Sequence, residues 1–202
     1  MTSDTYKTIE KPGKETLYRE KGSRFLGYTF PVKNEKEIEA YLNQLREEHH
    51  KARHVCYAWQ LGKNYDRFRA NDDGEPSNSA GMPIYGQIQA FEVTNILVAS
   101  VRYFGGTKLG VGGLITAYKE SAKLALEASE IITKTIDVEF RISFDYPEMS
   151  KVMEIVNREN LNVINQILEL DCQIFIQVRK KEAEKVFNLF DSVYKVEIEE
   201  VI

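Results

Sequence analysis

Long apolar runs are missing from this sequence, and cysteine and histidine are scarce. No segment approaches the roughly 18–20 apolar residues of a membrane-spanning helix, and residues 1–15 lack the apolar core of a secretory signal. The two cysteines, Cys56 and Cys172, form no C-x-x-C pair, so a cysteine-based metal site is not expected. We therefore expect a cytoplasmic protein with reduced cysteines and no membrane contact.

Excess charge of either sign is small as well. The formal net charge of −4 excludes the class of strongly basic nucleic-acid binders. The charge is nevertheless uneven, because residues 1–130 hold 18 Lys and Arg against 17 Asp and Glu, whereas residues 131–202 hold 9 against 14. A polyanion, if one binds, is therefore expected on the first part of the chain.

The second part has the clearest pattern, with apolar residues at the period of strands alternating with apolar stripes at the period of helices. Four strands and two helices are expected, at 136–144, 149–156, 161–170, 172–178, 183–190 and 196–198. The order β-α-β-β-α-β predicts a ferredoxin-like domain over residues 132–202. On the outward face of its two central strands only Phe175 could stack on a base, so this sheet is not expected to bind RNA.

The first part, residues 1–131, is predicted to be a mixed α/β domain, which makes the whole chain α+β. Asn34 and Glu37 have the spacing of a helix N-cap and its third residue. Residues 62–81 are rich in Gly, Asn, Asp and Ser and are expected to form a loop. Other elements are expected as a hairpin at 15–32, strands at 54–61 and 96–104, and helices at 35–45, 83–91 and 114–128.

A glycine-rich segment, R-Y-F-G-G-T-K-L-G-V-G-G-L at 102–114, connects the last of these strands to the last helix. It satisfies neither the P-loop motif nor the dinucleotide fingerprint. A strand, a glycine-rich turn and a helix N-terminus can still bind an anion, although the glycines could serve only the turn and close packing. The candidate anion-binding residues are Arg53, His54, Arg102, Gly105, Gly106, Lys108, Gly110, Gly112 and Gly113.

A second candidate is the polar segment N-D-D-G-E-P-S-N-S-A-G-M-P at 71–83. Its polar-site candidates are Asp72, Asp73, Glu75, Ser77 and Ser79. Carboxylates this close could bind Mg²⁺ or Ca²⁺, but the EF-hand spacing fails, and the alternative is a solvated loop with Ser77 or Ser79 capping the next helix. We assign no metal ligand and no catalytic residue here, because the serine motif G-x-S-x-G is not met.

A third segment, R-H-V-C-Y-A-W at 53–59, is expected to be a strand with His54 and Cys56 on the same face. Residues two apart on one strand are roughly 7 Å apart, which is too far for a Cys–His catalytic pair. His49, His50 and His54 with Cys56 match no known metal spacing. His54 and Cys56 are therefore both expected to be buried or to face a partner.

The three segments together resemble the IMPACT family, and most closely its two-domain bacterial branch, the YigZ-like proteins. The resemblance implies an N-terminal domain similar to the second domain of ribosomal protein S5. It also implies a C-terminal domain similar to the last domain of elongation factor G. The chain departs from the family pattern at Asn78-Ser79, where Gly-Thr is common, and at Thr116, where Arg is common.

The favoured function is that of a non-enzymatic protein that binds RNA or the ribosome through the N-terminal domain and regulates translation, with no cofactor. Two alternatives stay open. The chain could be a protein–protein adaptor without nucleic-acid binding, or a hydrolase of a phosphorylated or peptide substrate that uses His54, Asp72, Asp73 and Glu75. Fold resemblance alone does not choose among them.

Overall fold

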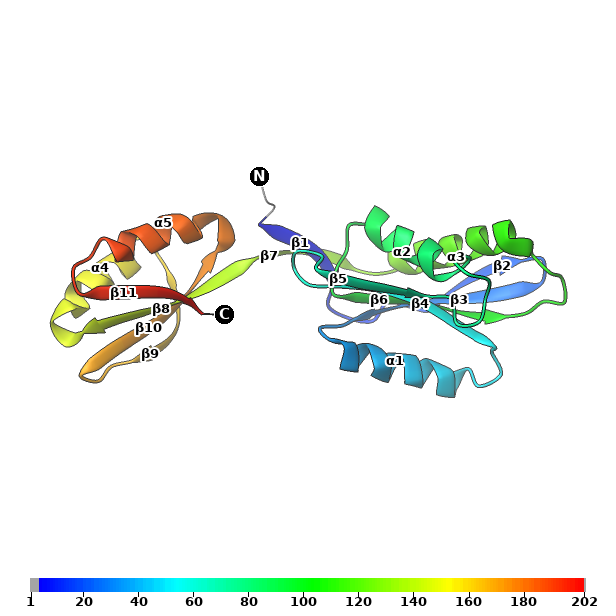
Figure 1. The fold of residues 1–202 in the computed structure, drawn as a ribbon, viewed down its shortest axis with the longest axis horizontal. Coiled ribbons are helices and arrows are strands. Elements are labelled where there is room, and N and C mark those ends of the chain that lie inside the picture. The colour runs from blue at the N-terminus through cyan, green and yellow to red at the C-terminus, as the bar shows by residue number, and fades with distance from the viewer. Residues whose placement is uncertain (1–3, 202) are drawn as a thin grey trace. The chain divides into compact units, whose positions relative to one another are not determined.

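The computed structural model describes residues 4–201, which form two compact α/β units (Figure 1). The larger unit is Tyr6–Lys134, and the smaller one comprises residues 135–201 together with residues 4 and 5. The outer ends of the two predicted domains, residues 1–3 and 202, lie outside the described residues. Within residues 4–201, no helix has both the length and the apolar character needed to cross a membrane.

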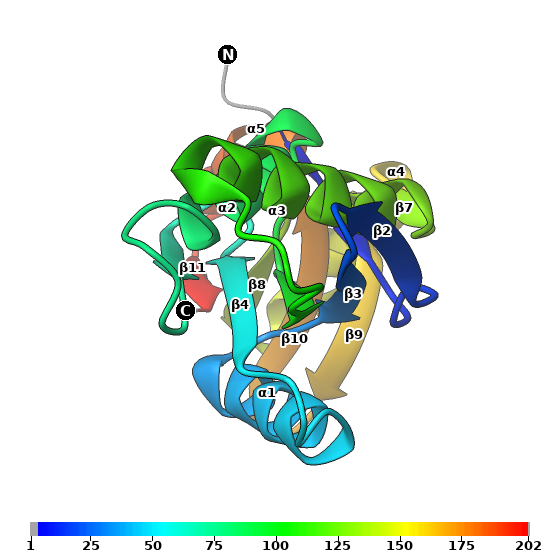
Figure 2. The same ribbon diagram turned by 90° about the vertical axis from the view of Figure 1, so that its right-hand side faces the viewer.

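The larger unit is built on a five-stranded antiparallel sheet in the order β2-β3-β6-β4-β5. One helix, α1, covers one face, and two helices, α2 and α3, cover the other (Figure 2). Two further strands, β1 and β7, pair with each other. The elements are β1 (Thr5–Ile9), β2 (Thr16–Glu20), β3 (Ser23–Pro31), α1 (Glu35–Glu48), β4 (His54–Leu61), β5 (Arg67–Asn71), α2 (Gly81–Ala90), β6 (Ile96–Tyr103), α3 (Gly110–Glu127) and β7 (Ile131–Thr135).

Both faces of this sheet are buried under helices, which explains why its central strands have apolar residues on both sides. In β4, Cys56 and Ala58 pack in the core under α2 and α3, whereas Tyr57 and Trp59 pack in the core under α1. Strand β6 is buried along nearly its whole length, as its continuous apolar run predicts. The predicted cap of α1 is confirmed, because Asn34 Oδ1 accepts a hydrogen bond from the Glu37 backbone N–H at 3.0 Å.

The smaller unit is a four-stranded antiparallel sheet in the order β11-β8-β10-β9, with two helices packed on one face. Its elements are β8 (Asp137–Asp145), the 3-10 turn η1 (Tyr146–Glu148), α4 (Met149–Arg158), β9 (Asn162–Ile167), β10 (Asp171–Arg179), α5 (Lys180–Asp191) and β11 (Val196–Val201). The predicted order of strands and helices is therefore confirmed. Phe175 lies on the face opposite the core, as its register in β10 predicts.

Four details of the larger unit differ from the sequence prediction. Strand β5 lies inside the predicted loop at 62–81, because its exposed charged residues give no apolar alternation. The pair β1 and β7 was not predicted. Helix α2 begins at Gly81, which puts Pro83 in the first turn, where proline is tolerated. Helix α3 begins at Gly110 and so contains the later glycines of the glycine-rich segment.

Candidate anion-binding cleft

A cleft of about 970 Å³ opens in the larger unit where β3, β4 and β6 meet the start of α3. Its size falls within the range of small-molecule sites. The lining residues are Gly22, Arg24, Lys51, Arg53, His54, Glu75, Pro76, Arg102, Tyr103, Phe104, Lys108, Leu109, Gly110, Val111 and Leu114. Of the predicted anion-binding residues, five line the cleft, namely Arg53, His54, Arg102, Lys108 and Gly110. Four do not, namely Gly105, Gly106, Gly112 and Gly113.

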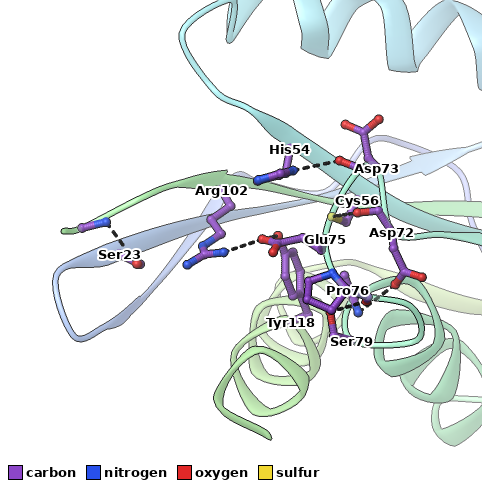
Figure 3. Close-up of polar contacts among 12 residues, drawn as sticks. Ser23, His54, Cys56, Asp72, Asp73, Glu75, Pro76, Ser79, Arg102 and Tyr118 are labelled. Carbon is purple, nitrogen blue, oxygen red and sulfur yellow. Dashed lines mark hydrogen bonds and ion pairs between the residues drawn. The ribbon is translucent and has the colours of Figure 1, made fainter. Parts of the chain in front are cut away.

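Arg102 is the most buried cation of the cleft, with 7% of its surface exposed. Its Nη1 donates to Glu75 Oε1 at 2.5 Å (Figure 3), and its guanidinium packs against the rings of Phe25 and Phe104, 5.5 and 5.6 Å from their centroids. Its Nε is buried and has no hydrogen-bond partner among residues 4–201. A buried donor without a partner is costly, so an acceptor that reached this nitrogen would be bound favourably.

Glu75 holds Arg102 in place from the α2 side of the sheet. Its side chain is 5% exposed, and Oε1 also accepts a hydrogen bond from the Tyr118 hydroxyl at 2.8 Å. Burial raises the pKa of the Tyr118 hydroxyl, so the phenol keeps its proton and donates. Glu75 therefore accepts hydrogen bonds from both Arg102 and Tyr118.

The first turn of α3 adds backbone donors to the same cleft. Within the described chain, no side chain caps this helix, and its first turn has no acidic residue. Uncapped N–H groups and the helix dipole favour an anion at such an end. Gly110 lines the cleft at this point with a φ of +71°, a conformation that glycine adopts without strain.

The charges around the cleft have one dominant sign. Five basic side chains line it, against one carboxylate, Glu75, that is already paired. The basic residues are Arg24, Lys51, Arg53, Arg102 and Lys108. A concave surface lined by one sign of charge attracts the opposite charge. The electrostatics of the cleft therefore favour an anionic ligand.

The polar side chains of the segment at 71–83 have different hydrogen-bond partners. Asp72 Oδ1 accepts from the backbone N–H groups of Ala80 and Gly81, at 2.9 and 2.8 Å, and Oδ2 accepts from that of Asn78 at 2.9 Å. Asp72 therefore caps α2, and the expectation that Ser77 or Ser79 caps it was wrong. The cap comes from Asp72 because the loop folds back on itself before the helix starts.

The remaining polar candidates also have local partners. Asp73 Oδ2 accepts from the Val55 backbone N–H at 2.7 Å. Ser79 is buried and donates to the Pro76 carbonyl at 2.6 Å, whereas Ser77 is exposed. Across residues 4–201, no three His, Cys, Asp or Glu side chains are grouped to hold a metal ion. Only Glu75 of this group lines the cleft.

We expect Asp72→Ala to lower the free energy of unfolding of the larger unit by about 2 kcal/mol, since three charge-assisted hydrogen bonds are lost at a helix start. Urea unfolding followed by tryptophan fluorescence measures this, because the single tryptophan, Trp59, is buried in this unit. The exposed Ser77→Ala should change stability by less than about 0.5 kcal/mol. Equal effects of the two substitutions would contradict the assigned cap.

Cys56 and His54 lie on one face of β4, as predicted, but each has a different partner. The Cys56 thiol donates to the Asp72 carbonyl at 2.9 Å, and burial raises the pKa of this thiol. A thiol that resists ionisation is a poor nucleophile. His54 Nδ1 lies 2.8 Å from the Asp73 carbonyl oxygen. The two side chains therefore do not form a Cys–His catalytic pair.

The cleft residues that sequence reasoning missed include Arg24, Lys51 and Phe104. Arg24 lies after the β2–β3 turn and Lys51 before β4, far in sequence from the glycine-rich segment. Only the pairing of β3 with β6 and of β6 with β4 brings them together. Phe104 is 57% exposed. The sequence signal that could have been used is a phenylalanine inside a glycine-rich segment.

Residues 21–126, more than half of the 202-residue chain, match the model of the Impact N-terminal domain. The match includes every residue that lines the cleft. Thr116, at which the sequence analysis noted a departure, does not line the cleft.

Curated relatives and solved structures extend this similarity. The chain is 33% identical over 148 residues to IMPACT family member YvyE of Bacillus subtilis, covering 73% of this chain and 68% of the relative. It is 32% identical over 161 residues to IMPACT family member YigZ of Escherichia coli, covering 79% and 77%. A crystal structure of a hypothetical protein shares the fold, with a TM-score of 0.69 and 24% identity over 97% of both chains. The chain therefore belongs to the IMPACT family.

Proposed function

We propose that the larger unit binds RNA through this cleft, without catalysis, and that the protein regulates translation by contacting RNA or the ribosome. The observation that carries the proposal is the buried guanidinium of Arg102. Its Nε has no partner within residues 4–201, and it lies beside an uncapped helix start and four further basic residues. Phosphate is the anion that such a combination of arginine and helix N-terminus suits.

A nucleic acid suits the cleft better than a small inorganic anion does. The basic residues come from three strand ends and the glycine-rich segment, which is a spread that several phosphates could follow. Phe104 is exposed next to Arg102 and offers a face on which a base could stack. An exposed aromatic beside basic residues is typical of single-strand binding.

The link to translation rests on resemblance. The βαββαβ order of the smaller unit supports the ferredoxin-like assignment, and with it the similarity to the last domain of elongation factor G. The likeness of the larger unit to the second domain of ribosomal protein S5 belongs to the same proposal. We propose domains at 1–131 and 132–202. The compact units of the structure have slightly different bounds, because the larger one is Tyr6–Lys134.

A protein partner is the second candidate, and an edge strand of the smaller unit favours it. All six residues of β9 are exposed, and Ile164 and Ile167 are 44 and 43% exposed. Leu170, just beyond the strand, is 90% exposed. An apolar sheet edge of this kind can accept a strand from another protein.

We expect Lys108→Ala to weaken binding of single-stranded RNA and to reduce the slope of log affinity against log salt by about 0.7, because one phosphate contact is lost. Fluorescence anisotropy across a salt series measures both quantities. Lys36→Ala is the matched control, since Lys36 is an exposed lysine on α1, which covers the opposite face of the sheet. If both variants bind RNA as the unchanged protein does, the cleft is not the RNA site, and the adaptor function moves ahead.

A further inference from the structure

We propose that His54 makes the cleft selective for ribonucleotides, by accepting a hydrogen bond from the 2′-hydroxyl next to a phosphate that Arg102 binds. The inference rests on the proposed function and adds a residue that decides which nucleic acid is chosen. Three observations carry it: the fixed tautomer of His54, its position beside Arg102, and the way that the loop at 73–75 holds its ring.

The hydrogen bond at Nδ1 determines what His54 can offer to a ligand. Nδ1 lies 2.8 Å from the carbonyl oxygen of Asp73 (Figure 3). A carbonyl oxygen only accepts, so the proton of the neutral imidazole must be on Nδ1. The lone pair is then on Nε2, which makes this nitrogen an acceptor. His54 lines the cleft, and no hydrogen bond to its Nε2 is seen within residues 4–201.

The ring of His54 is also held in one place. Its partner carbonyl belongs to Asp73, and the carboxylate of the same residue accepts from the Val55 backbone N–H at 2.7 Å. The backbone at Gly74 passes close to the ring, since a Cβ added at that position would be 3.5 Å from Nδ1. A ring fixed by its own strand and by the loop needs little reorganisation on binding. This acceptor is therefore positioned before a ligand arrives.

His54 and Arg102 are direct neighbours across the sheet. They are paired in the antiparallel register of β4 and β6, so their side chains leave the same face. The Cβ atoms of such a pair are about 4.5–5.5 Å apart. Arg102 has the partnerless Nε and lies near the uncapped start of α3. An acceptor for a hydroxyl group thus lies beside donors for a phosphate.

This pair of groups matches one feature of RNA. In a ribonucleotide the 2′-hydroxyl and the 3′-phosphate are on adjacent carbons of the sugar, so a hydroxyl donor and an anion lie side by side. The 2′-hydroxyl is the group that lets a protein distinguish RNA from DNA at a given site. DNA lacks this donor and would leave Nε2 without a partner, which lowers its affinity.

The experiment compares three single-stranded probes of one sequence, namely RNA, DNA and 2′-O-methyl RNA, which has no hydroxyl proton to donate. The unchanged protein should bind RNA about three- to tenfold more tightly than the other two. His54→Asn should remove the preference, because the amide can keep the bond to the Asp73 carbonyl but has no atom in the place of Nε2. His54→Gln, with a polar group near that place, should retain part of it.

The outcomes separate the inference from the proposed function. RNA and DNA bound equally well by the unchanged protein would overturn the inference and leave nucleic-acid binding intact. A preference for RNA that persists in His54→Asn, with the variant folded by its tryptophan fluorescence, would overturn the role of His54. Absence of binding to all three probes would overturn both. Loss of the preference in His54→Asn, with the affinity for DNA as the internal reference, would support the inference.

Discussion

Glu75→Gln should lower the free energy of unfolding of the larger unit by about 3–5 kcal/mol, although glutamine has nearly the same shape as glutamate. The side chains of Glu75 and Arg102, taken without their backbone atoms, are both more than nine-tenths buried, at 5 and 8% exposure. Removing the negative charge leaves a buried cation without a counter-charge. The Tyr118 hydroxyl still has an oxygen to donate to, so the loss comes from the ion pair.

A double variant distinguishes this cause from general damage to the site. Glu75→Gln combined with Arg102→Met removes both charges and keeps an acceptor for Tyr118. Removing both members of a buried ion pair leaves no unpaired charge, and hydrophobic replacements of similar volume are often neutral or stabilising. We therefore expect the double variant to recover most of the loss while binding RNA more weakly than the unchanged protein, because the cation at the base of the cleft is gone.

Urea unfolding, followed by the fluorescence of Trp59, measures the stability of all three proteins. A double variant that is as unstable as the single one would contradict the assignment of the loss to an unpaired charge. A double variant that recovers stability and binds RNA with undiminished affinity would show that Arg102 is not a ligand-binding residue. The expected combination of recovered stability and weakened binding would mean that the ion pair of Arg102 and Glu75 contributes to ligand binding more than to stability.

The parts of the fold that the sequence predicts are those whose signal is local. In β4, successive side chains point to opposite faces, so Cys56 and Ala58 lie in one core and Tyr57 and Trp59 in the other. This period of two residues can be recognised within a segment of eight. The six elements of the smaller unit are predicted for the same reason. Strand β5 is missed because it is mostly exposed, so its residues alternate in no apolar pattern.

The site is less predictable because its contacts join distant segments. The pair of Arg102 with Glu75 spans 27 residues, and the bond of Tyr118 to Glu75 spans 43. The sequence indicates that Arg102 and the glycine-rich segment could bind an anion, but not that Glu75 would pair with Arg102 and accept a hydrogen bond from Tyr118. The capping role of Asp72 likewise depends on how the loop folds back, which no local spacing specifies.

Gly105 and Gly112 are only seven residues apart, yet we expect opposite effects when each becomes alanine. A Cβ on Gly105 would overlap the carbonyl carbon of Gly22 and the backbone nitrogen of Ser23, because the segment packs directly on the β2–β3 turn. The Gly105 N–H also donates to Ser23 Oγ at 3.1 Å. Backbone atoms cannot give way as a side-chain end can. Gly105→Ala should therefore cost about 3 kcal/mol of stability and weaken RNA binding, as Phe104 and Lys108 are displaced.

Gly112 is the matched control within the same glycine-rich segment. It lies in the first turn of α3, its φ is not positive, and a Cβ there meets nothing within 4 Å. Because alanine favours the helix more than glycine does, Gly112→Ala should raise stability by about 0.5–1 kcal/mol. Unfolding of both variants by urea decides the matter. If Gly105→Ala is as stable as Gly112→Ala, the stability of the segment does not depend on the contact of Gly105 with the β2–β3 turn.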